Sequence, residues 1–303
     1  MRATLVELPG AGVMLARGPQ AVDLLHAQLT QELRDWPEAT ARMAALCTPQ
    51  GRMLADLLLW REPDGAIAML LDAELLEPTL KRLRMFILRL QCSLEDARAS
   101  HRVFGLLEPM AEGDNARDTW QVRHDGGLTR LRLPDAPGMR RTLLGARDDQ
   151  GMASLPALER GSEADWKLAE IRAGIGHVGS ATVQQFVPQM LNYEVLGAVD
   201  FHKGCYPGQE VVARTQYRGS VKRRTFRLLA AAPMQPGAEI FSSEDPGQPC
   251  GVVVACAPAE SPAWEALAEL KLAATHAGTL HLGAADGPRL ELGSLPYALP
   301  AEA

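Results

Sequence analysis

The chain of 303 residues has few cysteines and no cysteine cluster. Its five cysteines, at positions 47, 92, 205, 250 and 256, form no Cys-x-x-Cys pair and no Cys/His group at zinc spacing. We therefore expect no metal site, and in particular no four-thiolate iron–sulfur cluster held by the chain itself. A sparse, odd set of thiols without a signal peptide predicts a reducing, cytoplasmic compartment.

Long apolar runs and strong basic charge are also absent. The apolar stretch Met53–Trp60 contains Asp56 and is too short to span a bilayer, so we expect no membrane segment. The net charge of −6 argues against a surface coated in nucleic acid, although it leaves room for a local basic patch. With 47% apolar and 22% charged residues, the composition is that of a soluble globular protein of two or three domains.

The N-terminal third alternates strand and helix patterns. Leu25 and Leu29 form the apolar stripe of a first helix, and Asp72 is a plausible N-cap for a second. The resulting order β-α-β-β-(β)-α-β predicts a ferredoxin-like unit from Val13 to about Ala97. The predicted elements are strands at Val13–Ala16, Arg42–Cys47, Arg52–Trp60, Ala66–Leu71 and Leu90–Leu94, and helices from Gly18 to about Leu33 and from Ala73 to Arg89.

The remaining chain divides into a mixed segment and a strand-rich tail. The mixed segment has several short strand patterns and one helix, predicted from about Ala164 to Ala173 after the cap Ser162. After Lys222 the pattern changes to strands and turns, which predicts a small antiparallel β-barrel. Trp264–Ala273 is helical by propensity although it lies among strands. Cys250 and Cys256 belong to a valine-rich strand, where packing is the favoured role.

The richest stretch for chemistry is Asp200–Arg214. We predict a short strand ending near His202, a turn at Pro207-Gly208 and a helix from Gln209. Cys205 then lies before a helix N-terminus, where the helix dipole and Lys203 favour the thiolate. The alternative for Cys205 is a buried structural cysteine.

Two other readings of this region stay open. Asp200 and His202 share a strand face and could activate Cys205 as in a cysteine hydrolase, although such partners usually come from distant positions. A basic run could bind a polyglutamate tail or tRNA phosphates, or could simply be solvated. It comprises Arg214, Arg218, Lys222, Arg223, Arg224 and Arg227.

The segment Lys203-Gly-Cys-Tyr-x-Gly-Gln-Glu210 resembles the signature of the YgfZ family, folate-binding relatives of the glycine-cleavage T-protein. Trp166, Ile171 and Gly174 fit the family's W-x4-I-x2-G segment, and Phe186–Asn192 fits its F-x-P-Q-x-x-N segment. The match from Trp166 to Arg227 is specific, and weaker similarity covers most of the rest.

The resemblance implies an α+β fold of three domains around a central cavity that binds tetrahydrofolate or a derivative. The domains expected are residues 13–97, ferredoxin-like; residues 1–12 with 98–222, carrying the cysteine motif; and residues 223–303, the barrel, with a strand at Trp264–Ala273. The function implied is an accessory role in making or maintaining iron–sulfur clusters of client enzymes, including enzymes that modify tRNA. The site residues expected are Cys205 and Lys203 for chemistry, and Gln189, Asn192, Tyr206, Gln209, Glu210 and Arg214 for the folate.

The alternative function is folate-dependent aminomethyl transfer, the chemistry of the T-protein. The first acid of that protein's Gly-x-x-x-Asp-Asp stretch is replaced here by Ala55, and Arg172 stands where a pterin-binding glutamate is expected. His177 occupies a place where relatives tend to carry proline, which lowers the expectation of an imidazole-based role. These departures argue against a transferase, although Asp56 remains.

Overall fold

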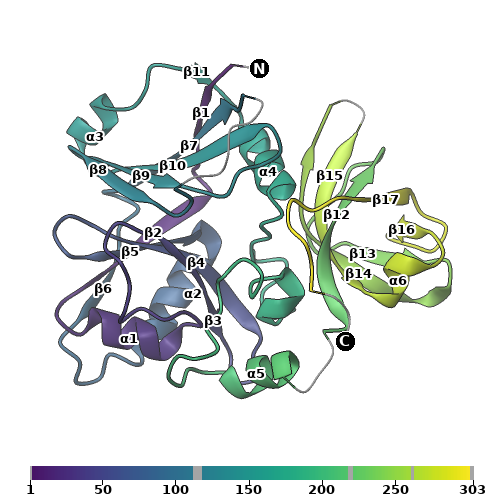
Figure 1. The fold of residues 1–303 in the computed structure, drawn as a ribbon, viewed down its shortest axis with the longest axis horizontal. Coiled ribbons are helices and arrows are strands. Elements are labelled where there is room, and N and C mark those ends of the chain that lie inside the picture. The colour runs from purple at the N-terminus through teal and green to yellow at the C-terminus, as the bar shows by residue number, and fades with distance from the viewer. Residues whose placement is uncertain (1, 112–117, 218–220, 261–262, 301–303) are drawn as a thin grey trace.

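The computed structural model describes residues 2–111, 118–217, 221–260 and 263–300. Their strands form two open sheets and one closed barrel (Figure 1). The three-part α+β architecture with a C-terminal barrel confirms the predicted fold class. Within the described residues, no helix is long and apolar enough to cross a membrane.

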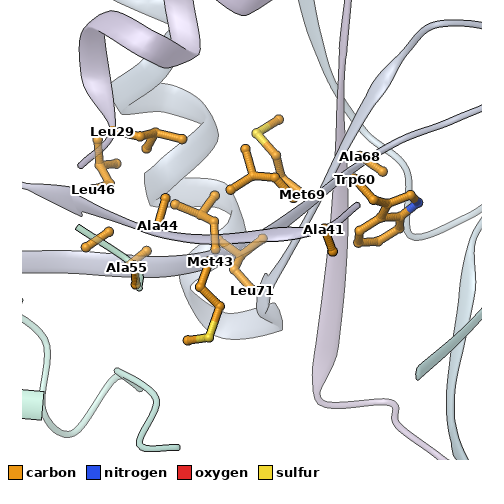
Figure 2. Packing of buried hydrophobic residues seen from close by; sticks show 14 of the residues in the cluster. Leu29, Ala41, Met43, Ala44, Leu46, Ala55, Trp60, Ala68, Met69 and Leu71 are labelled. Carbon is orange, nitrogen blue, oxygen red and sulfur yellow. The ribbon is translucent and has the colours of Figure 1, made fainter. Parts of the chain in front are cut away.

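The first sheet has the strand order β3-β4-β5-β2-β6 and confirms the ferredoxin-like element order. Figure 2 shows Leu46, Ala55 and Met69 among the apolar side chains that form its core. Its elements are β2 (Ala11–Arg17), α1 (Ala21–Gln28), β3 (Arg42–Cys47), β4 (Met53–Arg61), β5 (Ile67–Asp72), α2 (Ala73–Arg84) and β6 (Ser93–Asp96).

Both helices of this unit end earlier than their apolar patterns predict. The first stops at Gln28 instead of Leu33, because Leu29 turns to an extended backbone and bridges to Leu46. The second stops at Arg84 instead of Arg89 and continues as turns, so the closing strand starts at Ser93 instead of Leu90. Buried Leu29 and Leu33 continue the apolar stripe past α1, and the half-buried Phe86, Ile87 and Leu90 continue it past α2, although neither segment is α-helical.

The second sheet has the order β11-β1-β7-β10-β9-β8, and pairs N-terminal strand β1 with β7 and β11. Division of the chain at residues 12/13, 97/98 and 222/223 remains our proposal. The strands are β1 (Thr4–Glu7), β7 (Arg102–Pro109), β8 (Val122–Asp125), β9 (Leu128–Arg132), β10 (Met139–Ala146) and β11 (Glu159–Arg160), with helix α3 (Asp149–Ala153) beside them.

The C-terminal barrel closes in the order β12-β15-β14-β13-β16-β17. Trp264–Lys271 is strand β15, as the family resemblance implied, and the helical propensity is misleading. Ala266, Ala268 and Leu270 face the barrel core with the two-residue period of a strand. The other elements are β12 (Arg223–Ala230), β13 (Glu239–Ser242), β14 (Asp245–Pro258), α6 (Ala273–His276), β16 (Leu280–Leu282) and β17 (Arg289–Gly293).

Helix α4 (Glu163–Arg172) lies between the second sheet and the barrel (Figure 1). It starts at a capping box formed by Ser162 and Asp165, as predicted. The Trp166 ring covers Gly105 of β7 so closely that a Cβ added there would lie 2.1 Å from the ring. The missing side chain of Gly105 thus lets α4 settle on the sheet and places the next turns of the helix at the centre of the molecule.

Candidate functional site

A cavity of about 540 Å³ lies where both sheets, α4 and the barrel meet. The first sheet, the second sheet and the barrel contribute Asp56, Arg141 and Cys256, respectively. Helix α4 and the loop that follows contribute acidic, basic and aromatic groups. The polar and aromatic residues that line the cavity are Asp56, Asp72, Glu74, Trp120, Arg141, Glu163, Trp166, Lys167, Glu170 and His177.

A chain of alternating charges crosses this cavity. Arg141, which is 1% exposed, lies with its guanidinium 3.2 Å from Glu170 and stacks on the Trp166 ring at 4.9 Å. Glu170 also accepts a hydrogen bond of 2.8 Å from the Trp166 indole and lies 3.6 Å from His177 Nε2. His177 Nδ1 lies 2.5 Å from Asp56 Oδ2, which completes the chain. The two positive and two negative groups balance, which offsets the cost of shielding them from water.

His177 is held as an imidazolium by its two carboxylate neighbours. Burial lowers the pKa of His177, but the charges of Asp56 and Glu170 outweigh it and leave the pKa well above its usual value of 6.5. The side chain is 42% accessible, and it contributes to the cavity wall. The buried Tyr193 hydroxyl donates to Gly176 O at 2.9 Å and fixes the loop that carries the imidazole.

Asp56 is the acid that β4 presents to the cavity, whereas Ala55 lies in the apolar core on the opposite face of the strand (Figure 2). The alanine therefore removes no carboxylate from the cavity. Both Asp56 oxygens are engaged: Oδ1 accepts from Val178 N at 2.7 Å and Oδ2 contacts His177. Arg172 points toward the barrel and pairs with Glu265 at 2.7 Å. Neither substitution changes the wall of the cavity.

The residues that the sequence motif nominates are not those that line the cavity. Cys205 is exposed on the loop before α5 (Gln209–Tyr217), as predicted. Neither it nor the other seven nominated residues is among the described residues of the cavity wall, where the cysteine is Cys256. Figure 1 shows α5 near the lower end of β3, whereas α4 lies beside the second sheet and the barrel.

Gln189 and Asn192 serve the packing of the turn η1 (Pro188–Leu191). Both are fully buried. The Gln189 amide donates to Val212 O of α5 at 2.7 Å, and the Asn192 amide donates to Thr225 O of β12 at 2.9 Å. These amides tie down backbone, which is the ordinary role of such groups in an irregular segment.

Lys203 is buried and holds the end of α1. Its ammonium donates to His26 O and, at 2.7 Å, to Leu29 O, which are carbonyls that the helix leaves without internal partners. Burial lowers the pKa of Lys203 to about 8. The ammonium also lies 4.8 Å from the centre of the Tyr206 ring. Both residues therefore have a structural role in this arrangement.

The rest of the motif orders the loop. Gln209 donates to Lys203 O at 3.4 Å, and the predicted ion pair between Glu210 and Arg214 is present at 2.8 Å on the exposed face of α5. Gly208 has φ +86°, and a Cβ there would lie 2.5 Å from Thr48 O. Only glycine allows this close approach of the loop to the β3–β4 hairpin.

The hydrolase-like reading of this loop fails on geometry. The predicted strand around Val199–His202 is absent and the chain bends at residues 201–203, because Asp200 Oδ1 accepts the backbone N–H groups of His202 at 2.7 Å and Lys203 at 3.1 Å. The His202 ring is 93% exposed and lies 3.9 Å from Asp200, beyond hydrogen-bond distance. The structure thus gives Cys205 no oriented base from these two residues.

The basic run is largely neutralised by acids on neighbouring elements. Arg224 and Glu194, both buried, lie 2.7 Å apart, and Arg227 pairs with Glu265 at 2.8 Å. Arg223 pairs with Glu269 of β15. Arg218 lies outside the described residues. Arg224 thus joins the barrel to the segment after η1, while the pairs of Arg223 and Arg227 lie within the barrel, so these three described arginines form no free cationic surface.

No protein-family profile matches the chain. Among solved structures, it is similar to the glycine cleavage system aminomethyltransferase T from Bartonella henselae, with 17% identity and a TM-score of 0.76 over 97% of this chain and 86% of that one. The chain has the T-protein fold. A heterotetrameric sarcosine oxidase from Corynebacterium sp. U-96 is also similar, with 18% identity over 49% of this chain and 78% of that chain, at a TM-score of 0.31. At these identities the T-protein likeness shows the fold and does not transfer the enzyme's activity.

Most residues of the cavity wall are not indicated by the sequence motifs. Trp166 is indicated only as a motif residue, Glu170 belongs to no motif, and His177 stands where the family resemblance implies proline. One available signal was the i, i+4 spacing of Trp166 and Glu170 on a single predicted helix, which places the indole N–H beside the carboxylate. No local pattern could have indicated that Arg141 and Asp56 come from two different sheets to join them.

We expect His177→Asn to destabilise the protein by about 1–2 kcal/mol at pH 6, because two carboxylates lose a shared cation. Since the folded-state pKa of His177 is raised, its contribution is full below the unfolded pKa near 6.5 and is lost as pH rises through the folded pKa. Urea unfolding at a series of pH values from 6 upward measures this. The control His202→Asn, at an exposed position, should change the free energy of unfolding little at any pH. If His177→Asn lowers the free energy of unfolding by the same amount at every pH of the series, His177 is not held as an imidazolium.

Proposed function

We propose that the central cavity binds a reduced folate, tetrahydrofolate or a derivative, and that the protein does so in the cytoplasm. The observation that carries the proposal is the wall of the cavity, which combines five carboxylates, two indoles and the exposed Lys167 ammonium in a T-protein fold. The volume of about 540 Å³ falls within the range of small-molecule sites, roughly 300–1,000 Å³.

The residues present fit a folate. A pterin is flat and carries N–H donors along one edge, which suits a wall with indole faces and carboxylate acceptors. Trp120 and Trp166 supply the indoles, and Asp72 and Glu163 are carboxylates outside the His177 chain. Lys167 is exposed and also lines the cavity, so its ammonium suits the glutamate tail of the ligand.

We further propose, from the resemblance to the YgfZ family, an accessory role in iron–sulfur cluster assembly or maintenance, including clusters of enzymes that modify tRNA. Cys205 is the candidate reactive group, supported by its exposed thiol on a loop fixed by Lys203 and Asp200. The hydrogen bonds of the Lys203 ammonium to His26 O and Leu29 O fix this loop, so Lys203 is a positioning residue. Direct tRNA contact is outside the proposal because Arg223, Arg224 and Arg227 of barrel strand β12 are paired with acids.

Aminomethyl transfer is the second candidate, and the observation that favours it is Asp56 in the cavity wall. We rank it lower because both oxygens of that carboxylate already have partners. Aminomethyl transfer would become the favoured function if the wild-type protein formed methylene-tetrahydrofolate from an aminomethyl donor and Asp56→Asn did not.

Bound tetrahydrofolate should protect Cys256 from alkylation and leave Cys205 unaffected. Cys256 lies in the cavity wall, with its thiol donating to Met234 O at 3.0 Å, whereas Cys205 is exposed outside it. With ligand at ten times its dissociation constant, the modification rate of Cys256 should fall about tenfold. Mass spectrometry of iodoacetamide-treated protein measures both sites in one sample. Protection of Cys205 alone would place the ligand at the cysteine motif instead of the cavity. If neither cysteine is protected and calorimetric titration with tetrahydrofolate gives no heat, the folate proposal is wrong.

Cys205→Ala should abolish the support of iron–sulfur enzymes in cells while leaving the protein folded and able to bind folate. The reason is that the exposed thiol contributes little burial to the fold. The activity of a cluster-dependent enzyme is measured in cells that carry either the variant or the wild-type protein. The matched control is Cys92→Ala, a partly buried cysteine distant in sequence from the loop. Full enzyme activity with Cys205→Ala shows that the thiol has no chemical role.

A further inference from the structure

The turns that follow α2 expose an unusual pair of apolar side chains. Leu88 is 88% exposed and Met85 is 60% exposed, and they are two of five large apolar residues that are exposed in the described chain. Lys81 and Arg84 continue the same exposed helical face at spacings of three and four. We call Lys81, Arg84, Met85, Leu88 and Arg89 the basic apolar patch.

This patch rests on a fixed backbone. Successive turns are closed by hydrogen bonds from Phe86 N to Leu83 O at 3.0 Å and from Leu90 N to Ile87 O at 2.6 Å. The side chains of Phe86 and Ile87 pack against the core. At the far end, Gln20 Oε1 accepts from Gln91 N at 2.7 Å. The exposed leucine is therefore presented by an anchored segment.

Leu88 adopts a backbone conformation that leucine disfavours. Its φ is +41°, in the left-handed region where glycine and asparagine are the usual residues. Neither the backbone conformation of Leu88 nor burial of its side chain therefore stabilises the folded protein. Backbone strain clusters at functional sites and exposed apolar groups rimmed by polar residues mark interaction surfaces, so Leu88 points to a site that acts on another molecule.

The charge of the patch is opposite to that of the whole chain. The segment from 81 to 89 carries Lys81, Arg82, Arg84 and Arg89 and no acid, in a chain of net charge −6. The acids of the adjacent strand β6 are already paired, Glu95 with Arg17 and Asp96 with Arg98. The positive charge of the patch is therefore available to a partner.

Two of the arginines are held in place by contacts within the chain. Arg84 donates to Leu94 O at 2.8 Å, and the Arg82 guanidinium lies 5.2 Å from the centre of the Phe86 ring. A guanidinium whose position is fixed loses little conformational entropy when it binds a carboxylate. Arginine and methionine are also the residue types enriched at protein interfaces, where lysine is depleted.

We infer that the basic apolar patch docks an acidic segment of a partner protein whose apolar side chains cover Met85 and Leu88. The carboxylates of that segment pair with Lys81, Arg84 and Arg89 around this apolar centre. A lipid surface is a poorer match, because two side chains bury less hydrocarbon than a myristoyl chain, which alone binds membranes only marginally. This docking surface is separate from the folate cavity.

The test is selection of peptides from a random phage-displayed library on the wild-type protein. We expect enriched peptides to combine Asp or Glu with apolar residues at helical spacing. Measured by fluorescence anisotropy, their affinity should fall about thirtyfold in Leu88→Asp, the loss typical of a central anchor. It should also weaken as salt is raised from about 50 to about 300 mM. The matched control is Leu292→Asp, an exposed leucine on β17.

Leu88→Gly separates docking from folding. Because glycine accepts the left-handed backbone, this variant should keep or raise the melting temperature and still lose peptide affinity. Three results overturn the inference: no acidic sequence is enriched, the selected peptides bind Leu88→Asp and the wild type equally, or Leu292→Asp weakens them as much. Two further results overturn the peptide partner. If the wild type binds phosphatidylserine vesicles and not peptides, and Leu88→Asp loses that binding, the partner is a lipid surface. If the wild type self-associates in sedimentation and Leu88→Asp does not, the partner is a second copy of this chain.

Discussion

Ion pairs made from α4 and the loop after it hold the three parts of this protein around one cavity. Glu170 receives Arg141 from the second sheet, His177 reaches Asp56 in the first sheet, and Arg172 pairs with Glu265 in the barrel. The pairs with Asp56 and Glu265 span boundaries between structural units, whereas the pair with Arg141 fixes α4 on its own sheet, and each partner is at least partly shielded from water. Breaking one pair leaves an enclosed charge without its counterion, which costs far more than a surface pair gives. The shape of the cavity and the relative placement of the units therefore depend on the same contacts.

The cysteine motif and the cavity are two distinct places in the molecule. Lys203, Gln189 and Asn192 satisfy backbone carbonyls of α1, α5 and β12, and so fix the loop to its surroundings. Cys205 is left exposed on that scaffold. The arrangement separates the proposed binding of a folate, enclosed between sheets, from the proposed chemistry of a thiol, which is open to another protein. This separation suits an accessory factor, whose reactive group has to reach a second macromolecule.

Arg172 and Ala55 show why substitutions in a motif need the fold to interpret them. Read along the sequence, each appeared to remove an acid from a folate site. In the structure, Arg172 points to the barrel and Ala55 lies in the core, while Glu170 and Asp56, two positions and one position away, face the cavity. A shift of one residue in a strand reverses the side on which its side chain lies. The chemical character of the cavity is therefore set by residues adjacent to those in the motif.

The sequence by itself determined the ferredoxin-like element order, the cap of α4, the exposed loop of Cys205 and the start of α5, because periodicity, caps and turn residues act over a few neighbours. The barrel strand β15 came from the family resemblance, against local helical propensity. The ends of α1 and α2 could not be predicted from the sequence, since apolar side chains that pack on the core continue past both helices. The cavity wall was decided only by the tertiary structure, because Asp56, Arg141 and His177 meet from separate elements, and charges so far apart along the chain leave no local pattern.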